Sequence, residues 1–214
     1  MKRLERLILG ASIGAVAPIA GMLAGWWGMF EVVPERGVAL AAASGMAAGL
    51  LLDAIFLRRA VGRAHSSPLW MWAALYLFYA VGLFGIFMGV PVFIVLLGVP
   101  AGIAFAGRLV AAGAARGVVL REAGRAASFT TAVLAVACGA SATLALIDPY
   151  TAANLQGMLR LPFQVTSSMI LALILIGGAA LLAAQWVLTW ATIRWAHARL
   201  SSVPPAGSAP SPSA

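Results

Sequence analysis

The chain alternates between long apolar runs and short charged clusters. No charged residue lies between Leu7 and Phe30, and only Asp53 interrupts the apolar run from Gly37 to Leu57. A helix needs about 20 consecutive apolar residues to cross the hydrocarbon core of a bilayer. Each of these two runs therefore predicts one membrane-spanning helix.

The longest uncharged stretch runs from Ala64 to Gly107 and contains no Asp, Glu, Lys or Arg. It is roughly twice as long as one crossing requires, so the chain must turn back within it. Gly89-Val90-Pro91 is the expected turn, because glycine tolerates unusual backbone angles and proline suits the first turn of a helix. The stretch predicts a helical hairpin.

The whole pattern predicts an all-α integral membrane protein, a bundle of six transmembrane helices with both termini cytoplasmic. A single transmembrane domain is expected over residues 1–200, with spans at 7–30, 37–57, 69–88, 92–108, 126–147 and 166–190. Residues 201–214 carry no charge and are rich in Ser, Pro and Ala, which predicts a disordered tail.

Composition agrees with a membrane protein. The chain is 63% hydrophobic and 9% charged, whereas a soluble domain is about half apolar and about a quarter charged. A net charge of +8 could indicate nucleic-acid binding. The basic residues instead form short clusters between apolar runs, which is typical of loops held in the cytoplasm, so no nucleic-acid partner is expected.

Charge asymmetry gives the orientation. In the six-span arrangement only Arg36 and Arg160, of 14 basic residues, lie on the side opposite the termini. Because cytoplasmic loops are enriched in Lys and Arg, we expect both termini to be cytoplasmic. A single Lys beside many Arg and Ala is typical of a GC-rich bacterial genome, so we expect a multi-pass protein of a bacterial cell membrane. The expected partners are the bilayer, anionic headgroups at the cytoplasmic arginines, and a second copy or another membrane protein.

Asp53 is the one acidic residue within a predicted span, and an intramembrane carboxylate is a candidate site by default. Gln185, with Thr189 one turn on, lies at a similar predicted depth, and we consider an Asp53–Gln185 contact. The site could handle protons or cations. Alternatively, Asp53 reaches the interface near Arg58, and the polar residues serve helix packing. We favour this second interpretation.

Two prolines lie within predicted spans and are candidate helix kinks, Pro18 in the first and Pro100 in the fourth. These spans begin the two halves of a three-plus-three arrangement. Interrupted helices at matching positions in inverted repeats are typical of transporters, although the halves share no other similarity. Glycines four residues apart also indicate either close helix packing within the chain or self-association, at Gly10/Gly14, Gly21/Gly25, Gly45/Gly49 and Gly98/Gly102.

The predicted outer side collects Glu31, Glu35, Asp148 and Arg160. Together they could form a polar mouth for a cationic solute. More often such residues are solvated ends of loops, and the sequence leaves both interpretations open.

Catalytic motifs are absent, and no enzyme activity is expected. Six spans and an intramembrane serine resemble rhomboid proteases, but Gly139-Ala140-Ser141-Ala142 lacks the second glycine of their motif and no membrane-buried histidine is available as a base. No cluster of His, Cys and carboxylates predicts a metal site, and no nucleotide-binding glycine motif predicts a cofactor.

Two classes of function therefore stay open. The first is a small transporter or solute-binding membrane subunit, and the size and span count resemble the substrate-binding subunits of energy-coupling vitamin transporters. The second is a non-transporting accessory or scaffold protein that assembles with partner helices. A polar cavity at Asp53 or at the prolines would favour transport, whereas a small-residue core with an exposed groove would favour the accessory role.

Overall fold

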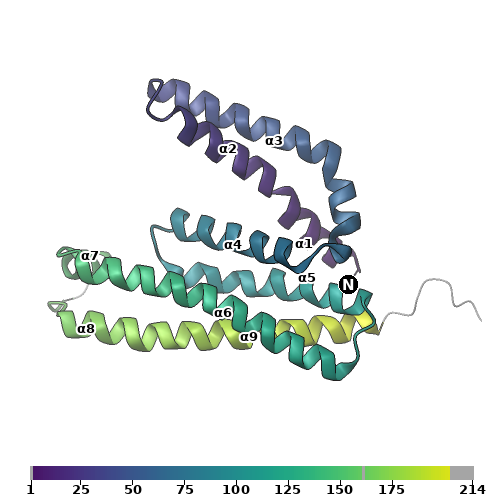
Figure 1. Cartoon of the computed structure of the whole chain (residues 1–214). Helices are drawn as coiled ribbons and strands as arrows, with labels where there is room; N and C mark the ends of the chain where they lie inside the picture. The colour runs from purple at the N-terminus through teal and green to yellow at the C-terminus, as the bar shows by residue number, and fades with distance from the viewer. Residues whose placement is uncertain (1, 161, 203–214) are drawn as a thin grey trace, which may run out of the picture. The chain divides into compact units, whose positions relative to one another are not determined.

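A computed structural model describes residues 2–160 and 162–202, and every regular element in this part of the chain is helical (Figure 1). The helices of the first half are α1 (Lys2–Gly14), α2 (Val16–Met29), α3 (Glu35–Arg63), η1 (Ala64–Ser66), α4 (Leu69–Ile86) and η2 (Pro91–Leu97). Those of the second half are α5 (Gly98–Ala111), α6 (Arg116–Ile147), α7 (Thr151–Leu159), α8 (Ser167–Ala172), η3 (Leu173–Gly177) and α9 (Gly178–Ser201). The predicted tail lies almost wholly outside the described residues.

Six of the helical segments are long and apolar enough to cross a membrane, as the hydrophobic pattern predicts. They are Leu7–Met29, Glu35–Arg63, Leu69–Ile86, Pro91–Ala111, Arg116–Ile147 and Ser167–Ser201. Several extend beyond the apolar runs in the sequence. The clearest is α6, which has 32 residues and takes in Arg121 and Arg125 from the basic segment before the predicted span. At 1.5 Å per residue it is about 48 Å long, well over the ~30 Å hydrocarbon core.

The chain divides into two compact units, with the boundary inside α4 after Leu75. In the first unit, α2 and α3 form an antiparallel pair in which glycine replaces side chains at the contact. A Cβ on Gly21 would overlap the carbonyl oxygen of Gly45, and a Cβ on Gly25 would overlap that of Ala41. Such close approach gives strong dispersion contacts between the two helices.

In the second unit, α5, α6 and α9 pack side by side (Figure 1). The helix pair α5 and α9 also depends on small residues, since a Cβ on Gly102 would lie 2.9 Å from the Cβ of Thr192. A separate cluster of buried residues joins α4, η2 and α6 through Tyr76, Ala80, Ile94 and Leu134.

The hairpin within the long uncharged stretch turns at Gly89. Met88 and Gly89 both have positive φ, at 53° and 83°, and the Gly89 amide donates to the carbonyl oxygen of Phe84 at 2.7 Å. Phe87 and Phe93 stack across the turn with ring centroids 3.7 Å apart. Glycine at position 89 avoids the steric strain that a side chain would suffer at this positive φ. The turn predicted from the sequence is therefore confirmed.

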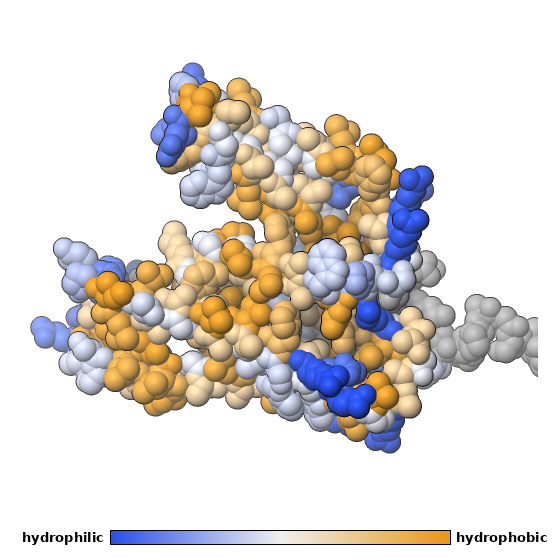
Figure 2. Space-filling model, in the orientation of Figure 1, coloured by the Kyte–Doolittle hydropathy of each residue, from blue (hydrophilic) through white to orange (hydrophobic). Residues whose placement is uncertain are grey.

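Most charged residues gather toward the helix ends, while largely apolar residues cover the lengths between them (Figure 2). In the second unit, one end carries the C-terminus of α5 with Arg108, the N-terminus of α6 with Arg116, and the C-terminus of α9 with Arg199. In the first unit, the antiparallel pairing brings the start of α1 to the same end as Arg58 and Arg59 of α3. Each unit therefore has one strongly basic end.

Candidate functional site

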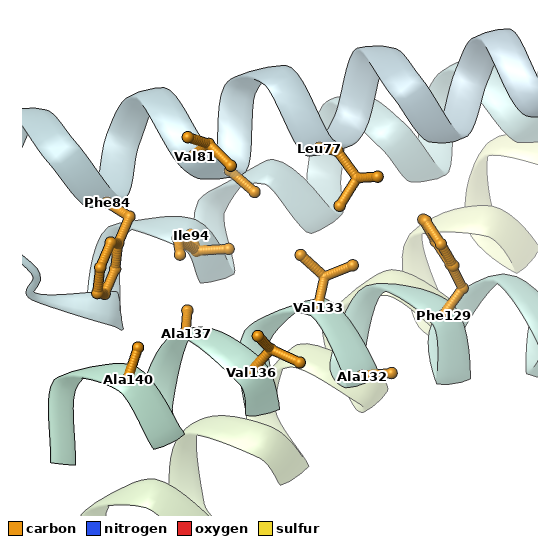
Figure 3. A pocket seen from close by; sticks show the side chains of 11 residues that line it. Leu77, Val81, Phe84, Ile94, Phe129, Ala132, Val133, Val136, Ala137 and Ala140 are labelled. Carbon is orange, nitrogen blue, oxygen red and sulfur yellow. The ribbon is translucent and has the colours of Figure 1, made fainter. Parts of the chain in front are cut away.

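An open apolar groove of about 380 Å³ lies between α4 and α6, with Ile94 of η2 at its floor (Figure 3). All eleven residues around it are apolar. They are Leu77, Ala80, Val81 and Phe84 of α4, Ile94 of η2, and Phe129, Ala132, Val133, Val136, Ala137 and Ala140 of α6. Almost no polar surface faces the groove, so it can bind an apolar group through burial and dispersion alone.

The sizes of the side chains explain why the groove exists. Phe84 lies toward one end and Phe129 toward the other (Figure 3). Between these rings the walls include the short side chains of Ala80, Ala132 and Ala137. The alanines on both walls are too short to fill the space between the two helices, which leaves part of the volume between the rings open.

The groove side of α6 follows helical spacing. Phe129, Ala132, Val133, Val136, Ala137 and Ala140 recur at intervals of three and four residues, which places them on one face. A second stripe on the same helix, with Ala127, Thr130 and Leu134, is buried. Both stripes are present in the sequence, but this span is apolar on every face. The hydrophobic pattern alone therefore could not distinguish the residues of the groove from residues that face lipid or from residues of the core.

Tyr76 connects the groove to a polar cluster in the interior of the second unit. Its ring packs edge-on against Phe129 with centroids 5.9 Å apart. Its hydroxyl accepts a hydrogen bond of 3.2 Å from Nε2 of Gln185, and the same Nε2 donates to Oγ1 of Thr189 at 3.2 Å. The sequence indicates Gln185 and Thr189 as candidates, and the structure brings them together. Nothing in the sequence indicates that Tyr76 joins them.

The polar cluster continues to α6. Oγ1 of Thr189 lies 3.2 Å from Oγ1 of Thr130, and the Thr130 hydroxyl donates to the carbonyl oxygen of Ala127 at 3.0 Å. Gln185, Thr189 and Thr130 are all buried, and Oε1 of Gln185 has no hydrogen-bond partner. The cluster is therefore only partly satisfied in hydrogen bonds, and the unpaired acceptor costs free energy.

Because Gly98 has no side chain, α5 packs directly against this cluster. A Cβ at Gly98 would lie 2.7 Å from Oγ1 of Thr189 and 3.2 Å from Nε2 of Gln185. The first distance is shorter than real Cβ contacts allow, so any larger residue would displace the polar side chains. The predicted Gly98/Gly102 pair thus packs within the unit.

Asp53 is half-buried in α3 and belongs to the first unit, whereas Gln185 belongs to the second. A Cβ on Gly14 would lie 3.7 Å from Oδ2 of Asp53, so the carboxylate faces α1. The predicted contact between Asp53 and Gln185 stays a prediction.

Both candidate prolines lie in the first turn of an α-helical segment. The first span is interrupted by a turn at Ala15, and Pro18 is the third residue of α2. The fourth span changes from a 3₁₀-helix to an α-helix at Gly98, and Pro100 is the third residue of α5. At such positions a missing N–H costs little.

The four candidates for an outer mouth are divided between the units. Glu31 follows α2 and Glu35 begins α3 in the first unit. In the second unit, Oδ1 of Asp148 accepts a hydrogen bond of 2.9 Å from the Tyr150 amide, and Arg160 ends α7 in a left-handed conformation with φ 50°. Asp148 and Arg160 thus shape the two ends of one short helix, α7.

No protein-family model, no curated protein and no solved structure matches this chain. The function must therefore be argued from the groove and the charge distribution themselves.

Proposed function

We propose that this chain is a multi-pass protein of the bacterial cell membrane with both termini in the cytoplasm. Six apolar helices of sufficient length support insertion. The basic end of each unit supports the orientation, because positively charged segments are retained on the cytoplasmic side. Arg194 stacks over the Trp190 ring at 4.3 Å near the basic end of α9, which suits the membrane interface.

We further propose that the chain acts as a solute-binding membrane subunit whose solute is apolar. The observation that carries this proposal is the groove between α4 and α6. Its floor is well packed, with Ala80 and Ile94 buried, while Val81 and Val136 at its rim are 69% and 75% exposed. A groove that is open to the bilayer and lined only by apolar side chains favours a hydrocarbon ligand over a polar solute.

Photolabelling with palmitate that carries a diazirine on its chain would test this function in the detergent-purified full chain. We expect saturable crosslinks on α4 and α6 around residues 77–84 and 129–140, displaced by unlabelled palmitate. Ala137→Phe should fill the groove and reduce labelling. Ala135→Phe is the matched control, because Ala135 is exposed on the same helix and does not line the groove. Labelling spread evenly over all six helices and unchanged by Ala137→Phe would reject the proposal.

The second candidate is the accessory role, in which a transmembrane helix of a partner occupies the groove. The exposed groove and the glycine-mediated helix contacts are the features expected of such a protein. Its α6 wall carries the short side chains of Ala132, Ala137 and Ala140. Small residues on one helix face let a partner helix approach closely. Co-purification of one stoichiometric membrane protein, lost in Ala137→Phe and kept in Ala135→Phe, would favour this function instead.

Transport of a polar solute stays a prediction that rests on Asp53 and the interrupted spans. Uptake of a broad solute panel into vesicles, compared between the native chain and Asp53→Asn at equal expression, tests it. Uptake that depends on Asp53 would favour transport over the apolar binding function.

A further inference from the structure

The groove ends close to a cation. Phe129 lies at one end (Figure 3), and Arg125 precedes it by one turn on the same face of α6. Four residues correspond to about 6 Å along the helix axis. The Arg125 side chain is 69% exposed, and its Nη1 donates to Oε1 of Glu122 at 2.8 Å. Guanidinium has five N–H donors, so several remain for a second acceptor.

The local charge favours an anion. Glu122 is shared between two arginines, because Nε of Arg121 lies 3.6 Å from the same Oε1. Two cations and one carboxylate leave this turn of α6 with a positive formal charge. Arginine binds phosphate through parallel N–H···O bonds, so the chemistry at this end of the groove suits a phosphate group.

The length of the groove distinguishes a lipid chain from a helix. From Phe129 to Ala140 it follows α6 for about 16 Å, which is roughly half the ~30 Å hydrocarbon core. An acyl chain from one leaflet has that reach. A partner transmembrane helix would need a matching surface across the whole core, and the groove covers only part of it.

We propose that the groove binds one acyl chain of an anionic phospholipid whose headgroup phosphate pairs with Arg125. This inference rests on the proposed binding function and names its ligand class. The acyl chain is held by burial against Ala80, Ile94 and Ala137, and the headgroup of the lipid adds charge selectivity. A partner helix is the alternative occupant.

Native mass spectrometry of the detergent-purified full chain tests the proposal, with dioleoylphosphatidylglycerol and dioleoylphosphatidylcholine as the two probes. We expect the anionic lipid to bind about fivefold more tightly, the effect of one basic residue at an anionic headgroup. Arg125→Gln should abolish this preference by weakening phosphatidylglycerol more than phosphatidylcholine, because the choline cation offsets the charge of the phosphate in the second lipid. Arg116→Gln, an exposed arginine at the start of the same helix, should keep most of it. Ala137→Phe should weaken both lipids.

The outcomes separate the two levels of the proposal. If Ala137→Phe weakens both lipids but the native chain does not discriminate between them, the headgroup site is wrong and the apolar groove stands. If Ala137→Phe changes neither lipid, the groove does not bind lipid, and both proposals fail. A partner helix occupying the groove would give this second result.

Discussion

The hydroxyl of Tyr76 accepts a hydrogen bond of 3.2 Å from Nε2 of Gln185, although the two residues lie 109 positions apart in the chain. This bond joins α4 to α9, while the ring of the same tyrosine packs on Phe129 at the end of the groove. The Tyr76 side chain therefore contacts both the polar interior of the second unit and the wall of the groove.

Removal of that hydroxyl should loosen the second unit. We expect Tyr76→Phe to lower the free energy of unfolding by about 0.5–1.5 kcal/mol, because the Gln185 amide loses one of its two acceptors. Denaturation in mixed detergent micelles measures the change. Tyr150→Phe is the control, since the Tyr150 side chain is 69% exposed, and it should be nearly neutral. Equal stability of the two variants would show that the hydrogen bond contributes nothing.

Addition of a methyl group at Gly98 should disturb the polar cluster. The new Cβ would meet Oγ1 of Thr189 at 2.7 Å, so we expect Gly98→Ala to destabilise the protein by about 1–3 kcal/mol. Gly124 lies within α6 with nothing within 4 Å of a Cβ, and Gly124→Ala should be neutral or stabilising by up to about 1 kcal/mol. Thermal unfolding of both variants in detergent tests this contrast, and a loss no larger for Gly98→Ala would refute the close packing.

In the first unit, Gly45→Ala should separate α2 from α3. The added Cβ would overlap the carbonyl oxygen of Gly21, and backbone cannot move aside as a flexible side chain can. Crosslinking between cysteines placed on α2 and α3 should fall in this variant. Gly28→Ala, where a Cβ has open space, should leave crosslinking unchanged. Unchanged crosslinking in Gly45→Ala would contradict the glycine-mediated contact.

A charge at the rim of the groove should prevent insertion. Val136 is 75% exposed, so Val136→Asp would be tolerated in water. At the middle of a membrane span Asp costs about 2.5–3.5 kcal/mol. We expect a marked fall in membrane-integrated protein, measured by fractionation and blotting. Val118 precedes the predicted span at 126–147, so Val118→Asp should integrate normally. Equal yields of the two variants would place Val136 outside the membrane.

The sequence predicts much of the fold because hydrophobic runs of this length leave few alternatives. The six apolar helices and the turn at Gly89 follow from run length and from glycine. The start of α6 was less predictable than its end at Ile147, since arginines stop an apolar run without stopping a helix. An α-helix continues for as long as its backbone hydrogen bonds can form, and the residues from Arg116 to Arg125 form them readily.

The candidate sites were harder to predict. Gln185 and Thr189 stand out as polar residues in an apolar span, and their grouping follows from a spacing of one helical turn. Tyr76 and Thr130 join them only through packing between distant helices. The groove depends on where Phe84 and Phe129 lie relative to alanines on a facing helix, and one sequence does not give that register.

The proposed orientation in the membrane requires that the loops alternate between the two sides of the bilayer, and cysteine accessibility tests this most directly. In a Cys138→Ala background, single cysteines replace Val32, Gly62, Gly117 and Gly157, all at exposed positions. A membrane-impermeant maleimide applied to intact cells should label positions 32 and 157, and should label 62 and 117 only after permeabilisation. Labelling that places positions 62 and 117 on opposite sides of the bilayer would contradict the arrangement.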